Sequence, residues 1–171
     1  MATLSLSSSP VALHRIRQAR PPDAAAIAGV IRPFAADGLM LPRSEGVIAR
    51  QIHEYRVAES VESGAVVGSV AIRPFNRNLA EIIAFAVASG WQGKGIGVEL
   101  LEGAVEECLL RGFERVFAMT MRPGIFQRLG FEDVPRELVP EKIRRDCRGC
   151  PFRVGCRERT MLLDVRSASA S

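Results

Sequence analysis

The sequence lacks long apolar runs, and among its 171 residues it has only two lysines, two histidines and one tyrosine. No run approaches the ~20 apolar residues of a membrane-spanning helix, so we expect no membrane association. The serine-rich start has neither the basic region nor the continuous apolar stretch of a secretory signal. We therefore expect a disordered tail over residues 1–11 and a cytoplasmic location.

The net charge of +4 comes from one segment of the chain. Residues 136–159 hold eight basic and four acidic side chains, whereas the remaining residues balance at fifteen of each sign. A local basic patch of this kind suits a small anionic ligand better than the phosphate backbone of a nucleic acid. We therefore predict a small-molecule substrate and no nucleic-acid partner.

Strand and helix patterns alternate along the chain. Strand patterns occur at residues 14–20, 65–72, 80–87, 115–120 and 159–165, and helix patterns at 22–31, 44–55, 95–111 and 124–129. Ser44 is the expected N-cap of the second helix. No repeat or linker divides the chain, so one α/β domain is predicted over residues 12–166, with a C-terminal tail at 167–171.

A glycine-rich string lies between the strand pattern ending at residue 87 and the following helix. It reads Trp91, Gln92, Gly93, Lys94, Gly95, Ile96 and Gly97. The backbone N–H groups at a helix start have no helical partner, and glycines allow a phosphate to approach them closely. The spacing fits neither a dinucleotide-binding fingerprint nor a Walker A loop. The string predicts a pyrophosphate cradle; a turn required only for close helix–sheet packing is the alternative.

This string resembles the Q/R-x-x-G-x-G/A motif of the GNAT superfamily of N-acetyltransferases, and residues 125–131 resemble its second signature. The resemblance implies a mixed, mostly antiparallel twisted sheet flanked by helices, with acetyl-CoA as cosubstrate. It places the pyrophosphate on residues 92–97 and Phe126 near the CoA end of the site. It also implies that the pantetheine arm pairs with Phe85, Ala86 and Val87.

A narrower resemblance concerns the acceptor. Residues 39–44, 80–87 and 116–120, with the cysteines near the C-terminus, are similar to short bacterial N-acetylglutamate synthases. That similarity implies acetylation of the α-amino group of L-glutamate, the first step of arginine biosynthesis. The alternatives are another amino acid, a protein N-terminus, or a CoA-binding regulatory module without turnover. A homodimer is the candidate assembly.

Two residues are the candidates for acid–base catalysis. Glu81 lies in an otherwise apolar strand, so its carboxylate must be paired or hydrated, or its pKa must be raised. The resemblance also implies a catalytic glutamate here, and we predict a general base; an ion pair with an arginine of a neighbouring strand is the alternative. Many GNAT enzymes have a tyrosine where Phe126 stands, so Thr120 becomes the candidate acid, with satisfaction of backbone groups as its alternative role.

Four arginines are candidates for binding the two carboxylates of glutamate, because planar guanidinium groups suit carboxylates. Arg43 and Arg157 follow from the synthase resemblance, and Arg73 and Arg159 are the further candidates.

Cys147, Cys150 and Cys156 have the spacing of three ligands. A structural zinc site usually needs four ligands, and no histidine or second Cys-x-x-Cys pair lies nearby. We therefore expect reduced structural cysteines and no metal.

Overall fold

The computed structural model describes residues 12–168. Its strands are β1 (His14–Gln18), β2 (Tyr55–Ser60), β3 (Val66–Pro74), β4 (Leu79–Val87), β5 (Arg115–Thr120), β6 (Glu132–Val134) and β7 (Arg159–Asp164). The helices are α1 (Ala24–Ala36), α2 (Glu45–Arg50), α3 (Ile96–Leu110), α4 (Gly124–Arg128), α5 (Pro140–Arg145) and α6 (Val165–Ala168). Short 3-10 turns are η1 (Pro21–Asp23), η2 (Ile52–Glu54), η3 (Ser89–Trp91), η4 (Arg136–Leu138) and η5 (Cys147–Gly149).

The strands form one seven-stranded sheet in the order β1-β2-β3-β4-β5-β7-β6. Only β4 and β5 run parallel; every other neighbouring pair is antiparallel. A parallel pair needs a crossover connection, and α3 supplies it between these two strands. The predicted mixed, mostly antiparallel sheet flanked by helices is confirmed.

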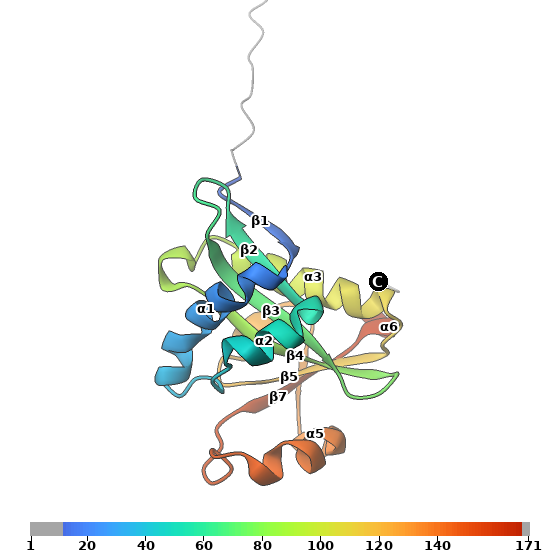
Figure 1. Cartoon of the computed structure of the whole chain (residues 1–171). Coiled ribbons are helices and arrows are strands. Elements are labelled where there is room, and N and C mark those ends of the chain that lie inside the picture. Colours follow the sequence, from blue (N-terminus) through green and yellow to red (C-terminus); the bar gives the residue numbers. More distant parts are fainter. Residues whose placement is uncertain (1–11, 169–171) are drawn as a thin grey trace, which may run out of the picture.

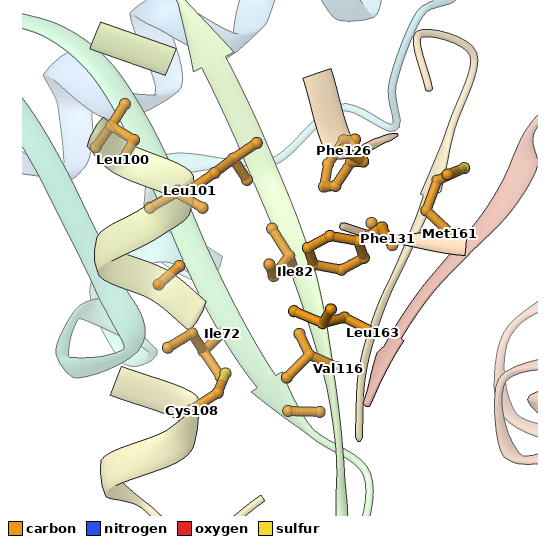
Figure 2. Close-up of a cluster of buried hydrophobic side chains, with 14 of the residues drawn as sticks. Ile72, Ile82, Leu100, Leu101, Cys108, Val116, Phe126, Phe131, Met161 and Leu163 are labelled. Carbon is orange, nitrogen blue, oxygen red and sulfur yellow. The ribbon is translucent and has the colours of Figure 1, made fainter. Parts of the chain in front are cut away.

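Helices cover both faces of the sheet (Figure 1). Helix α3 packs on one face through a stripe of Ile96, Leu100, Leu101, Ala104 and Cys108, all buried, as its sequence pattern predicts. Figure 2 shows this stripe against strand residues and against two phenylalanines from the α4–β6 segment. Helices α1 and α2 cover the opposite face. The sheet is therefore packed against helices on both faces.

The largest error of the sequence prediction concerns β2. Ser44 does cap α2, and its Oγ accepts a hydrogen bond from the Val47 N–H at 3.3 Å. The helix was expected to continue to Tyr55, but it ends at Arg50, and Tyr55 begins a strand between β1 and β3. Strands buried on both faces lose the alternating pattern that marks a strand in sequence, which explains the error.

Two further elements, β6 and α5, have no counterpart in the predicted pattern. Helix α6 includes residues 167 and 168, although these belong to the predicted C-terminal tail. The predicted N-terminal tail, 1–11, and residues 169–171 lie outside the described residues. None of the described helices combines the length and apolarity needed to cross a membrane.

Candidate functional site

The parallel strands β4 and β5 separate partway along their length. In the described part of the chain their ladder joins residues 79–81 to residues 115–117 and goes no further. Beyond it lies a cavity of about 900 Å³. Its walls come from residues 85–87 of β4, most of residues 91–98, residues 120–122 at the end of β5, helix α4, and Phe34 of α1 with the α1–α2 loop. The opening leaves this edge of β4 available to pair with an extended ligand.

A bulge in β4 shapes the inner end of this opening. Ala84 has a φ of 52°, in the left-handed region that residues other than glycine rarely adopt. The register between β3 and β4 shifts at the same level, between Ser69 and Ala71. The buried Ser69 hydroxyl donates a 2.8 Å hydrogen bond to the Ala84 carbonyl. Such strained residues cluster at functional sites, and this one turns the strand where it borders the cavity.

The glycine-rich string forms the turn into α3. Gly93 and Gly95 have positive φ values of 75° and 83°, and Gly95 is the N-cap of the helix. The Gln92 side chain donates a 3.0 Å hydrogen bond to the Val87 carbonyl, which ties the turn to the end of β4. The first residues of the 15-residue helix line the cavity. The backbone N–H groups of a first helical turn have no helical partner, and the helix dipole favours negative charge there, so this end of the helix suits an anion.

At Gly97 the turn packs closely against neighbouring side chains, which is the alternative considered for this string. A Cβ added at Gly97 would lie 3.1 Å from Ile125 Cδ1 and 3.3 Å from Phe85 Cζ. Of the predicted cofactor-binding residues, only Lys94 does not line the cavity; its Nζ lies 6.0 Å from the centre of the Trp91 ring. That the remaining residues bind CoA stays a prediction, which the cavity's size and position favour.

Phe126 occupies the wall opposite β4. It is buried, and its ring packs edge-on against Phe85 at 5.9 Å and against Phe131 at 5.4 Å. These contacts explain why an apolar ring suits this position. The same ring offers no proton donor at the cavity.

Glu81 lies where the β4–β5 ladder ends, and its side chain is only 2% exposed. Its Oε1 is 2.8 Å from Lys142 Nζ, and its Oε2 accepts from Arg73, which lies directly opposite on β3. Asp146 completes the network by contacting both Lys142, at 3.0 Å, and Arg73. The considered alternative for Glu81, an ion pair with an arginine of a neighbouring strand, is thus present. Its role as a base stays a prediction.

Thr120 lines the cavity, but not on the side of Glu81. Alternation along β5 places Thr120 with Val116 and Ala118 toward α3, whereas Glu81 lies opposite Phe117 on the other face. The Thr120 Oγ accepts a 3.0 Å hydrogen bond from the Arg122 N–H, which is the alternative role considered for it. The two candidate catalytic residues therefore lie on opposite faces of the sheet, and the opening between β4 and β5 connects those faces.

The four candidate arginines are not gathered in one pocket. The Arg73 guanidinium is engaged by Glu81 and Asp146. Arg159, on β7, forms an ion pair with Asp133 on the neighbouring edge strand β6. Arg157 is exposed, and Arg43 is half-buried.

Arg43 lies near Tyr55, which the structure brings to the same face of the sheet as Arg73 and Glu81. Tyr55 is fully buried, and its hydroxyl has no hydrogen-bond partner among the described residues. Burial raises the pKa of Tyr55, while the charges of Arg43 and Arg73 oppose that increase. Positive charge therefore gathers around this buried phenol.

The cysteines near the C-terminus follow α5. All three are half-buried thiols without a disulfide. Burial raises the pKa of the Cys147 thiol. Within residues 12–168, no group of three or more His, Cys, Asp or Glu side chains is placed to hold a metal ion.

Lys142, Asp146 and Ser69 are the site residues that sequence reasoning missed. One signal was available for Lys142, because it is one of only two lysines in a chain with 21 arginines. Asp146 precedes Cys147 in the segment that carries the synthase resemblance, but no role followed from that; the packing of α5 brings it to Glu81's partners.

Residues 32–131 match the model of the acetyltransferase (GNAT) family. An uncharacterized N-acetyltransferase, CT2212 of Chlorobaculum tepidum, is 38% identical over 153 residues, covering 90% of this chain and 97% of that protein. The amino-acid acetyltransferase of Neisseria meningitidis serogroup B is 32% identical over 135 residues, or 78% of this chain. The chain spans only 30% of the length of that relative.

Solved structures of similar fold include an N-acetylglutamate synthase and a protein that was crystallised with CoA. N-acetylglutamate synthase from Neisseria gonorrhoeae, complexed with coenzyme A and N-acetyl-glutamate, has a TM-score of 0.78 and 29% identity, covering 90% of this chain and 35% of that one. Rv2747 from Mycobacterium tuberculosis, in a complex that contains CoA, has a TM-score of 0.75 and 26% identity over 88% of this chain and 98% of that one. The chain therefore belongs to the GNAT family, as an acetyl-CoA-dependent N-acetyltransferase related to the amino-acid acetyltransferases.

Proposed function

We propose that this chain transfers the acetyl group of acetyl-CoA to the α-amino group of L-glutamate. The observation that carries the proposal is the position of Glu81, a buried carboxylate between two cations on β4, three residues before the bulge that borders the cavity. Such a site offers a proton acceptor for an amine together with positive charge for carboxylates. The likeness to the N-acetylglutamate synthase of Neisseria gonorrhoeae supports the choice of acceptor.

The cavity would hold the cosubstrate in an extended form. The pyrophosphate would lie at the start of α3 on Gly93, Gly95 and Gly97, where free N–H groups and the helix dipole favour it. The pantetheine arm would pair with the open edge of β4 at residues 85–87. This arrangement directs the thioester toward the bulge at Ala84 and toward Glu81 beyond it.

The reaction needs one proton acceptor and one proton donor. The amine nitrogen attacks the thioester carbonyl, the C–S bond breaks, and CoA leaves as a thiolate that takes up a proton. Glu81 would accept the proton lost by the amine, directly or through water. Thr120 retains a hydroxyl proton while its oxygen accepts from the Arg122 N–H, so it is the candidate donor to the thiolate.

Arg43 is the proposed partner of the side-chain carboxylate. It belongs to the α1–α2 loop, whose Leu39 and Met40 line the cavity, and it carries positive charge toward Tyr55. A carboxylate bound there would satisfy the guanidinium and lie within reach of the buried phenol.

A thiol-release assay with acetyl-CoA and a panel of amines tests the proposal. L-glutamate should be acetylated in clear preference to glutamine, lysine and spermine. Arg43→Ala should raise the KM for glutamate more than the KM for acetyl-CoA, and Arg50→Ala, which removes an exposed arginine from the same region, should change neither. Equal turnover of glutamine and glutamate would refute recognition of the side-chain carboxylate.

A further inference from the structure

The network around Glu81 contains two acidic and two basic side chains, and helix α5 together with the residue after it supplies two of the four. Arg73 and Glu81 come from adjacent strands, whereas Lys142 and Asp146 come from α5 and the residue after it, four positions apart. The side chains of Arg73, Lys142 and Asp146 are 20%, 13% and 25% exposed. The network is therefore neutral in total and largely withdrawn from water.

The two cations differ in how firmly they hold Glu81. Arg73 is fixed by the register of β3 and also lies 5.0 Å from the centre of the Phe75 ring. Lys142 reaches Glu81 through a flexible four-carbon stem from a short helix. An acceptor ammonium that approaches Glu81 meets both carboxylate oxygens already engaged, so one cation has to move. Lys142 is the cation that can move.

A displaced Lys142 ammonium needs a new partner. Asp146 would then be the one ion-pair partner that the described residues show for both Lys142 and Arg73; the charge of Glu158 also acts on Lys142, but no ion pair is seen between them. A partly buried cation without a full partner is costly. An α-amino acid brings a carboxylate one carbon atom away from its ammonium. Because Lys142 Nζ and Glu81 Oε1 are only 2.8 Å apart, one such molecule can satisfy both groups together.

We propose that Lys142 binds the α-carboxylate of the acceptor through an exchange of ion pairs. The acceptor ammonium takes the place of Lys142 at Glu81, and the acceptor α-carboxylate takes the place of Glu81 at Lys142. The inference rests on the proposed acetylation of an amino acid, and it makes Lys142 the residue that selects α-amino acids over simple amines and α-amides.

The exchange predicts a specific dependence on the α-carboxylate. Wild-type protein should prefer L-glutamate over its α-amide, which keeps the side-chain carboxylate, by about 10- to 100-fold in kcat/KM, the usual effect of one charged hydrogen bond. Lys142→Met should lower kcat/KM for L-glutamate and bring this preference close to one. Lys142→Arg should restore part of it, because the positive charge remains.

The control is Arg144→Met, which removes an exposed positive charge from the same helix and should leave the preference unchanged. Circular dichroism and acetyl-CoA titration establish that each variant is folded, and Lys142→Gln is the second variant if the methionine variant is not. An equal fall in kcat/KM for the acid and the amide in Lys142→Met would show a structural role and overturn the inference.

The same experiment separates this inference from the proposed function. If glutamate is not acetylated but another α-amino acid is, the choice of glutamate fails, and that amino acid and its α-amide decide the role of Lys142. If wild-type protein acetylates L-glutamate and its α-amide equally well, the exchange is refuted while glutamate acetylation stands. If the protein acetylates no α-amino acid at all, both the proposed function and the role of Lys142 are refuted.

Discussion

Replacement of Glu81 by glutamine should separate catalysis from stability at this site. The glutamine side chain keeps the size of the carboxylate but cannot accept a proton from the acceptor amine. It also removes the negative charge that Arg73 and Lys142 share. Two effects are therefore expected from one change, and they are measured in different experiments.

The catalytic effect should be the larger one. Loss of a positioned general base lowers kcat by about 10²-fold or more. Acetyl-CoA affinity should hardly change, because Glu81 does not line the cavity. Raising the pH should partly rescue the variant, since solvent then supplies more of the free amine. Measurement of kcat for both proteins between about pH 6 and 9.5 tests this expectation.

The stability effect follows from the two ion pairs. Breaking a buried ion pair by removing one partner costs about 3–5 kcal/mol. Arg73 and Lys142 are partly exposed and both retain Asp146, so we expect about 3 kcal/mol, at the lower end of that range. Urea unfolding of wild-type and variant protein measures this difference.

Glu59 on β2 offers a matched control. Its carboxylate is also nearly buried and also holds two arginines, Arg15 and Arg17, but it lies away from the cavity. Glu59→Gln should lower stability and leave kcat unchanged. A Glu81→Gln variant with wild-type kcat at neutral pH would refute the general-base role and leave Glu81 as a structural ion-pair partner.

Three further outcomes are expected. Gly97→Val should lower the free energy of unfolding in urea by about 1–3 kcal/mol, because its Cβ would already lie 3.1 Å from Ile125 Cδ1; unchanged stability would contradict this close packing. Burial alone would raise the pKa of Asp146, but Lys142 and its other cationic partner bring it below the ordinary 3.8. Asp146 therefore stabilises the fold above that value and loses this contribution as the pH falls through its folded-state pKa, so Asp146→Asn should lower the unfolding midpoint most at pH 7, and the difference should shrink as the pH falls below 3.8. Burial raises the pKa of Cys108 to about 12, so its alkylation at pH 8, followed by mass spectrometry, should require unfolding.

The glycine-rich string illustrates what local sequence can determine. Positive φ values at Gly93 and Gly95, and the start of α3 directly after them, depend on residues that are neighbours in the chain. The apolar stripe of α3 is equally local, because a helix brings every third or fourth residue to one face. The sequence alone therefore determined the α/β class, the glycine turn that begins α3 and the family resemblance; the binding of a pyrophosphate at that turn stays a prediction.

The surroundings of Glu81 depended on tertiary structure. Sequence chemistry required some partner for a carboxylate in an apolar strand, but it could not choose among 21 arginines and two lysines. Arg73 became the partner through the β3–β4 register, and Lys142 through the packing of α5, 61 positions along the chain. Tyr55 shows the same limit, because burial on both faces of β2 removes the alternation by which a strand is recognised. Contacts between distant segments set the charges around Glu81, and no periodicity in the chain encodes them.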